Sequence, residues 1–203
     1  MSLDVAAPPL PRSFYARPVL HVARDCIGKI LVHRAADGLS AGRIVETEAY
    51  RGPDDLAAHS AGGRRTPRTE VMWGPAGHAY VFLLYGMHWA FNIVAAEAGQ
   101  PHAVLVRALE PVAPLEAMAK RRKMAADRVA LSNGPGKLCA ALGIRGDHYG
   151  LDLCGGDLYL IDGPRGRVGR SPRINIDYAG AWVDKPWRFY ERSNRFVSVR
   201  PRD

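Results

Sequence analysis

Two glutamates and a tyrosine occupy every second position of the segment 46–50. The surrounding residues 43–50 read RIVETEAY, a pattern typical of a strand, whose period of two puts Glu46, Glu48 and Tyr50 on one face. A carboxylate held beside an aromatic ring and away from water is suited to act as a general base. The competing interpretation is a surface strand with two solvated glutamates, and this segment taken by itself favours it.

An aromatic-rich pair of segments follows further along the chain. Residues 78–84 and 89–94 are apolar runs joined by the tetrapeptide YGMH at 85–88, which predicts a β-hairpin with an unusually apolar tip. Proteins that extract a base from DNA insert apolar side chains into the stack and hold the base between aromatic faces. Tyr85 and Met87 suit such an insertion, although a tip that packs on a neighbouring loop explains them as well.

Positive charge is concentrated in one loop and is in excess overall. Residues 62–68 read GGRRTPR, which combines two glycines that allow close backbone approach with three guanidiniums. The chain carries 28 Lys and Arg against 20 Asp and Glu, a formal net charge of +8. This balance favours a polyanionic partner such as a nucleic acid, while composition leaves a solvated basic face equally open.

The segment GPGK at 134–137 looks like part of a nucleotide-binding loop. The full motif also needs glycine at 131 and serine or threonine at 138, where this chain has Leu131 and Leu138, so a nucleoside triphosphatase is excluded. A helix start flanked by glycines still offers backbone N–H groups to one phosphate, with Lys137 beside it.

Histidines and cysteines give no sign of a metal centre. The seven histidines lack the spacing of zinc ligands. Cys26, Cys139 and Cys154 are an odd number at wide spacing, so we expect small core residues and neither disulfides nor a metal clip.

The remaining patterns predict helices and strands in irregular alternation. Expected helices cover residues 18–27, 54–60, 114–126 and 133–143, and expected strands cover 29–32, 42–50 and 104–109 in addition to the hairpin. A turn at Asp37-Gly38 makes the first two strands an antiparallel pair. We expect one mixed α/β (α+β) domain over residues 13–203, built on an antiparallel sheet.

The N-terminal residues 1–12 contain three prolines and are expected to form a flexible leader. No run of eighteen or more apolar residues occurs, and the leader lacks the apolar core of a secretory signal. We therefore expect a cytoplasmic protein without a membrane partner.

Several blocks together resemble one known family. They are RIVETEAY at 43–50, GP at 52–53, AAHS at 57–60, GGR at 62–64, TPR at 66–68, YGM at 85–87, NI at 92–93, RALEP at 107–111 and KP at 185–186. In this order they resemble the alkyladenine (3-methyladenine) DNA glycosylase family, from about residue 16 to 199. The resemblance implies one domain with a curved antiparallel sheet, surrounding helices and a protruding hairpin that enters the minor groove of DNA.

The resemblance also implies roles for individual residues around a flipped purine. Glu48 would be the general base that holds the attacking water, helped by Arg107 and the carbonyl group of Ile174. The walls of the base pocket and the residue that rejects guanine would be Tyr50, His59, Phe82 and Asn92.

Further residues are implied to contact DNA. Tyr85, with Met87 beside it, would fill the vacated stack, and the phosphate contacts would come from Arg64, Thr66, Arg68 and Lys137. The chain departs from the family pattern at three positions, with Phe82 and His88 in place of tyrosines and Asn175 in place of a glycine. These departures concern substrate range and backbone contacts, and they leave the reaction unchanged.

The implied activity is that of a monofunctional DNA glycosylase of base excision repair. It would act as a monomer on double-stranded DNA, in a bacterium at the nucleoid, and release 3-methyladenine, 7-methylguanine, hypoxanthine or ethenoadenine. Alkylation at N3 or N7 makes a purine cationic and weakens its glycosidic bond, so a positioned water and a base suffice without metal or organic cofactor.

Two alternatives stay open at this point. A bifunctional glycosylase and lyase needs a lysine amine at the pocket, but the blocks around Glu48, His59 and the hairpin contain none. A non-catalytic nucleic-acid-binding module is disfavoured because binding DNA gives no reason for a carboxylate beside the aromatic wall.

Overall fold

The strand that carries the paired glutamates, β2 (Gly38–Arg51), is the longest strand and lies in the middle of the sheet. In the computed structural model, which describes residues 7–112 and 114–200, β2 pairs antiparallel with β1 (Ile30–Ala35), β5 (His102–Val112) and β8 (Arg188–Glu191). Alternating β-branched and polar residues favour this extended conformation. The expected pairing of the strands at 29–32 and 42–50 is confirmed.

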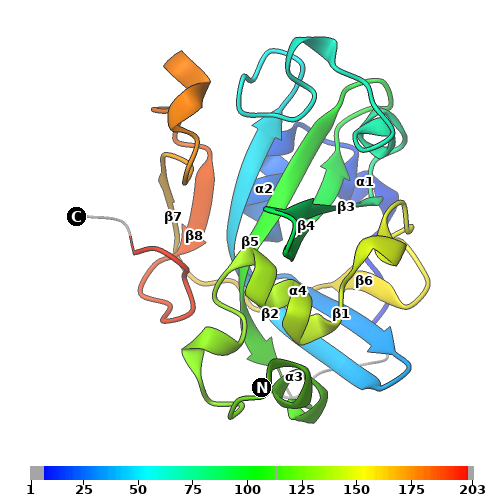
Figure 1. Ribbon diagram of the computed structural model, residues 1–203, viewed down its shortest axis with the longest axis vertical. Coiled ribbons are helices and arrows are strands. Elements are labelled where there is room, and N and C mark those ends of the chain that lie inside the picture. The colour runs from blue at the N-terminus through cyan, green and yellow to red at the C-terminus, as the bar shows by residue number, and fades with distance from the viewer. Residues whose placement is uncertain (1–6, 113, 201–203) are drawn as a thin grey trace.

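The sheet has eight antiparallel strands, in the order β3-β4-β5-β2-β1-β6, with β8 also paired to β2 and β7 to β8. The remaining strands are β3 (Ala79–Leu84), β4 (His88–Ala95), β6 (Leu158–Ile161) and β7 (Val168–Ser171). β3 and β4 form the expected hairpin, and the pair Leu84 and His88 closes its tip at residues 85–87. The sheet curves, so that β3 and β4 cross in front of the long strands (Figure 1). The expected mixed α+β class is confirmed.

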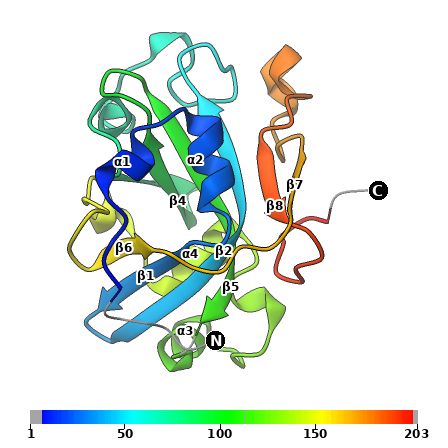
Figure 2. The ribbon, with the colours of Figure 1, turned by 180° about the vertical axis from the view of Figure 1, so that it is seen from behind.

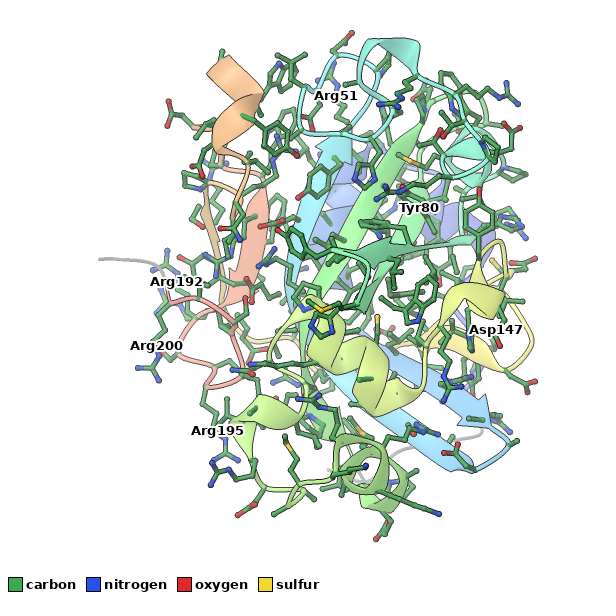
Figure 3. All side chains as sticks on the ribbon, viewed as in Figure 1. Arg51, Tyr80, Asp147, Arg192, Arg195 and Arg200 are labelled. Atoms are coloured by element: carbon green, nitrogen blue, oxygen red, sulfur yellow. The ribbon has the colours of Figure 1, made fainter. Side chains whose placement is uncertain are left out.

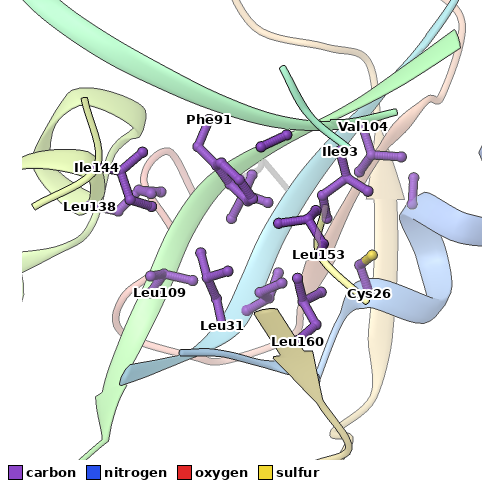
Figure 4. Packing of buried hydrophobic residues seen from close by; sticks show 14 of the residues in the cluster. Cys26, Leu31, Phe91, Ile93, Val104, Leu109, Leu138, Ile144, Leu153 and Leu160 are labelled. Carbon is purple, nitrogen blue, oxygen red and sulfur yellow. The ribbon is translucent and has the colours of Figure 1, made fainter. Parts of the chain in front are cut away.

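Among residues 7–112 and 114–200, four α-helices complete the core around this sheet. They are α1 (Arg12–Tyr15), α2 (Val19–Cys26), α3 (Glu116–Arg122) and α4 (Pro135–Leu142). α2 covers the rear of the sheet (Figure 2), and the largest cluster of buried side chains joins Cys26 of α2 and Leu138 of α4 to Phe91 and Leu160 of the strands (Figure 4). Cys139 is buried as expected, whereas Cys154 is only half-buried.

Short 3₁₀ helices occupy several connections. They are η1 (Ala61–Gly63), η2 (Glu70–Trp73), η3 (Val129–Leu131), η4 (Gly146–His148) and η5 (Asp177–Trp182). No helix in residues 7–112 and 114–200 combines the length and the apolar character that a membrane span requires.

Two expected helices differ from the structure. The helix predicted at 54–60 is wrong, because the Asp55 carboxylate accepts the backbone N–H groups of Arg51 and Ala57 and so stabilises turns. The helix predicted at 114–126 covers only Glu116–Arg122, since Lys123 adopts a left-handed conformation with φ of 51° that ends it.

Only part of the expected leader falls within the described residues, since 1–6 lie outside them. Leu10 donates its N–H to the carbonyl of Leu160 at 2.7 Å, and Arg12 pairs with Asp152 at 2.5 Å. The flexibility of the leader stays a prediction.

Candidate active site

Glu48 is fully buried in the second half of β2, where donors from three segments surround its carboxylate. Oε1 accepts the backbone N–H of Ile174 at 2.8 Å. Oε2 accepts the hydroxyl of Tyr50 at 2.8 Å and Nη1 of Arg107 at 3.2 Å. Because a carboxylate oxygen accepts about two hydrogen bonds, Oε1 retains a lone pair for one further donor.

The three donors hold the carboxylate in one orientation. Burial raises the pKa of Tyr50 well above its ordinary value, and the neighbouring Glu48 adds to the shift, so this hydroxyl stays protonated and donates. Burial opposes the charge of Arg107, but Glu48 and Glu46 outweigh it and the pKa of Arg107 is raised. Glu48 therefore lies between a permanent cation and a permanent hydroxyl donor.

A cavity of about 440 Å³ opens in front of these donors. Its volume falls within the usual range for small-molecule sites. Aromatic and aliphatic side chains make up most of its lining, and Arg107 and Ile174 reach it from the side of Glu48. Among the lining residues are Tyr50, His59, Tyr80, Phe82, Asn92, Asn175 and Tyr178. The fold thus brings the four wall residues expected from the sequence to one cavity, directly in front of the buried carboxylate.

His59 forms part of this wall as a neutral ring. Its Nδ1 lies 2.7 Å from the hydroxyl of Tyr80, and its Nε2 lies 3.4 Å from Nη2 of Arg68. Burial against the cavity wall, together with the charges of Arg68 and Arg64, lowers the pKa of His59 to about 4, although part of the ring faces open space. Since Arg68 can only donate, Nε2 accepts and Nδ1 carries the proton toward Tyr80.

With this geometry established, comparisons with known proteins identify the family. The family described as methylpurine-DNA glycosylase matches residues 13–195. The chain belongs to this family.

Relatives from several organisms agree over nearly the whole chain. A protein of Desulfitobacterium hafniense is 48% identical over 200 residues, covering 94% of this chain and 98% of its own. One of Clostridium acetobutylicum is 45% identical over 203 residues, covering 96% and 99%, and one of Methanocella arvoryzae is 48% identical over 195 residues, covering 95% and 97%. Each is named "Putative 3-methyladenine DNA glycosylase". The chain is thus a DNA glycosylase, a hydrolase that acts in DNA repair with DNA as its substrate.

The methylpurine-DNA glycosylase hairpin presents two large side chains to solvent. Tyr85 is 81% exposed and Met87 71% exposed, and both belong to the three-residue tip. Tyr85 adopts a φ of 50°, which is an uncommon backbone conformation for a bulky residue, and Gly86 follows with a φ of 70°. Tyr85 also lines the cavity, and the insertion of Tyr85 and Met87 into DNA stays a prediction.

The four residues expected to bind phosphate have different surroundings. Arg64 is exposed. The backbone N–H and the hydroxyl of Thr66 are hydrogen-bonded to the hydroxyl of Thr69 in the same loop. Lys137 lies in the first turn of α4, and its Nζ donates to the side chain of Asn133, just before the helix, at 2.9 Å. Arg68 instead lies with its guanidinium 4.6 Å from the ring centre of Phe82. Arg68 therefore supports a wall of the cavity, a contact that its place in a basic loop did not predict.

Asn92 lies opposite Tyr80 in the β3 and β4 register, and Phe82 lies opposite Ala90. Its amide donates to the carbonyl of Tyr80 at 3.1 Å, and the side chain lines the cavity. The bond to the backbone and the position in the wall therefore coexist.

Sequence reasoning missed a buried ion pair behind Tyr50. The side chains of Arg173 and Asp55 are both 0% exposed, and they form two hydrogen bonds at 2.5 and 2.8 Å. The Arg173 guanidinium lies 4.7 Å from the ring centre of Tyr50. Arg173 directly precedes Ile174 in the chain. The only signal in the sequence was an acidic residue in a segment rich in glycine and proline, which does not reveal a partner more than a hundred positions away.

Proposed function

We propose that this chain is a monofunctional glycosylase that flips a damaged purine out of duplex DNA into the cavity and hydrolyses its N-glycosidic bond with water activated by Glu48. One observation carries the proposal. The Glu48 carboxylate is buried and oriented by Ile174, Tyr50 and Arg107, immediately behind an aromatic cavity, and Oε1 keeps a free lone pair.

The reaction needs few groups. A water whose O–H donates to Oε1 of Glu48 would attack C1′ of the sugar, and the carbonyl of Ile174 would be its second acceptor. The C1′–N bond breaks and the purine departs with the electron pair, while Glu48 takes the proton of the water. A purine alkylated at N3 or N7 leaves as a neutral base, and an abasic sugar with a C1′ hydroxyl remains.

The walls suit a flat, extruded base. Tyr50, His59 and Phe82 offer aromatic faces, and stacking on such faces is worth on the order of 1–3 kcal/mol per base. The exposed Tyr85 would fill the gap in the duplex, Met87 would lie beside it, and Arg64, Thr66, Arg68 and Lys137 would contact phosphates. Asn92 would exclude guanine. We expect the protein to act as a monomer on double-stranded DNA.

Incubation with duplexes that contain single lesions tests the proposal. Purified protein should release free 3-methyladenine and 7-methylguanine, detected by chromatography, and leave an intact abasic strand. Hypoxanthine and ethenoadenine duplexes then define the substrate range. The described residues that line the cavity include no lysine, so borohydride should trap no covalent DNA adduct. Failure to release any base, or a trapped adduct, contradicts the proposal.

A further inference from the structure

A second buried carboxylate lies beside Glu48 and does not line the cavity. Glu46 is 0% exposed, and Oε1 accepts Nε of Arg107 at 3.1 Å and Nε of Arg188 at 2.7 Å. Ser198 adds its hydroxyl at 3.0 Å to the same oxygen and its backbone N–H at 2.6 Å to Oε2. A buried charge is costly unless it is paired and hydrogen-bonded, so this full set of donors fixes Glu46 in one position.

Arg107 connects this carboxylate to Glu48. Its guanidinium is a rigid planar fork, of which Nε binds Glu46 and Nη1 binds Glu48. When Glu46 holds Nε, the direction of Nη1 is set as well. A β-bulge at Glu46, where the register between β2 and β5 shifts, directs both glutamates toward the same arginine.

The charges of this cluster balance. Glu46 and Glu48 carry two negative charges, and Arg107 and Arg188 carry two positive ones. Without the Glu46 carboxylate, an excess positive charge would face Glu48, and Arg107 would be free to bind Glu48 with both ends of its fork. Glu48 would then offer fewer lone pairs to water.

The C-terminal residues 194–199 complete the cluster. Phe196 and Val197 are buried against Val45 of β2, and the guanidinium of Arg188 donates to the carbonyl of Val199. This brings Ser198 onto Glu46, outside residues 13–195 that the family match covers. Figure 3 shows the outer side of this region, where Arg192, Arg195 and Arg200 gather along one edge of the molecule.

We propose that Glu46 is a positioning residue of the excision reaction, which acts through Arg107 to hold Glu48 ready for water, and that Ser198 in the C-terminal segment holds Glu46. The proposal rests on the proposed function of Glu48. The charged groups and hydroxyls around Glu48 are Tyr50 and Glu46 of β2, Arg107 of β5 and Arg188 of β8. Farther off lie the Arg173 and Asp55 pair beside Ile174, and Tyr178 of η5.

Glu46→Gln and Ser198→Ala test the proposal in the full chain. For Glu46→Gln we expect single-turnover release of hypoxanthine or 7-methylguanine to slow at least tenfold at saturating enzyme, while the Kd for lesion DNA stays within threefold. Ser198→Ala should slow release about threefold with unchanged binding.

Glu191→Gln is the matched control, because it removes a partly buried carboxylate that pairs with Arg43 in the same sheet, away from the cavity. Its rate should stay within twofold of the wild type. The proposal is overturned if folded Glu46→Gln keeps the wild-type rate, or if Glu191→Gln slows release as much. Should Glu46→Gln fail to fold, a wild-type rate in Ser198→Ala overturns it. A wild type that releases no base contradicts the proposed function instead.

Discussion

Asn92 shows how one side chain can serve both the fold and selectivity. Its amide donates to the Tyr80 carbonyl while the rest of the side chain faces the cavity. Guanine carries an amino group at C2 that adenine and hypoxanthine lack, so a side chain packed on that edge disfavours guanine by steric conflict. 7-Methylguanine carries the same group, but its cationic ring weakens the glycosidic bond and offsets this penalty.

We therefore expect Asn92→Ala to raise release of normal guanine relative to hypoxanthine roughly tenfold, the scale of one small group in a pocket. Matched duplexes and base chromatography measure this ratio, with Asn92→Ser as a smaller change at the same site. An unchanged ratio in folded protein assigns guanine rejection to another wall residue, with His59 or Phe82 as the next candidates.

Two arginines of the basic loop should behave differently. Arg64 is exposed, so Arg64→Gln should weaken binding to damaged and undamaged DNA about equally. It should also reduce the slope of the logarithm of the DNA-binding constant against the logarithm of the salt concentration by about one. Arg68 lies on the ring of Phe82. Arg68→Gln should therefore weaken binding to lesion DNA more than binding to undamaged DNA. Equal losses of affinity for the two DNAs would mean that Arg68 only binds phosphate.

Among the strands, the hairpin of β3 and β4 exposes large side chains to solvent at its tip. Its tip exposes 81% of Tyr85 at a backbone conformation that a bulky residue rarely adopts. Tyr85→Ala should make flipping of ethenoadenine less favourable by about 1–3 kcal/mol. The fluorescence of an ethenoadenine duplex measures the resulting smaller flipped population. Leu83→Ala, on the same hairpin but before the tip, is the control. A normal signal from Tyr85→Ala contradicts the assignment.

The elements that the sequence predicted are those with a clear apolar or alternating pattern. β2, β3 and β4 are buried on both faces over most of their length, so the alternation predicted the strands but not that both faces are covered. Gly143 ends α4 with a φ of 75° as its position suggested. The helix prediction for residues 54–60 failed because the Asp55 carboxylate pairs with Arg173, a partner that the local sequence pattern cannot reveal. Likewise, RIVETEAY predicted a shared face for Glu46, Glu48 and Tyr50, but not the donors from the C-terminal third of the chain that surround them.

At the scale of the whole molecule, buried ion pairs tie distant segments to the sheet behind the cavity. Arg173 and Asp55 are the clearest case, with both side chains fully buried. Removing one partner leaves an uncompensated buried charge, so Asp55→Asn should lower the free energy of unfolding by about 3–5 kcal/mol. Glu70→Gln breaks an exposed pair with Arg65 and should leave the free energy of unfolding nearly unchanged, because solvent screens this pair. Denaturant titration compares them, and similar losses would contradict this account.

Glu48 is the residue on which the proposed activity depends. It lies on β2, Arg107 of β5 and the loop at Ile174 orient it, and the cavity lies in front of it. Glu48→Gln keeps the shape of the side chain and removes its basicity. Single-turnover release of a damaged purine by this variant, measured beside its Kd for lesion DNA, should fall by roughly 10²–10⁴-fold with binding retained. Release within tenfold of the wild type, about 1.4 kcal/mol of barrier, would exclude Glu48 as the general base.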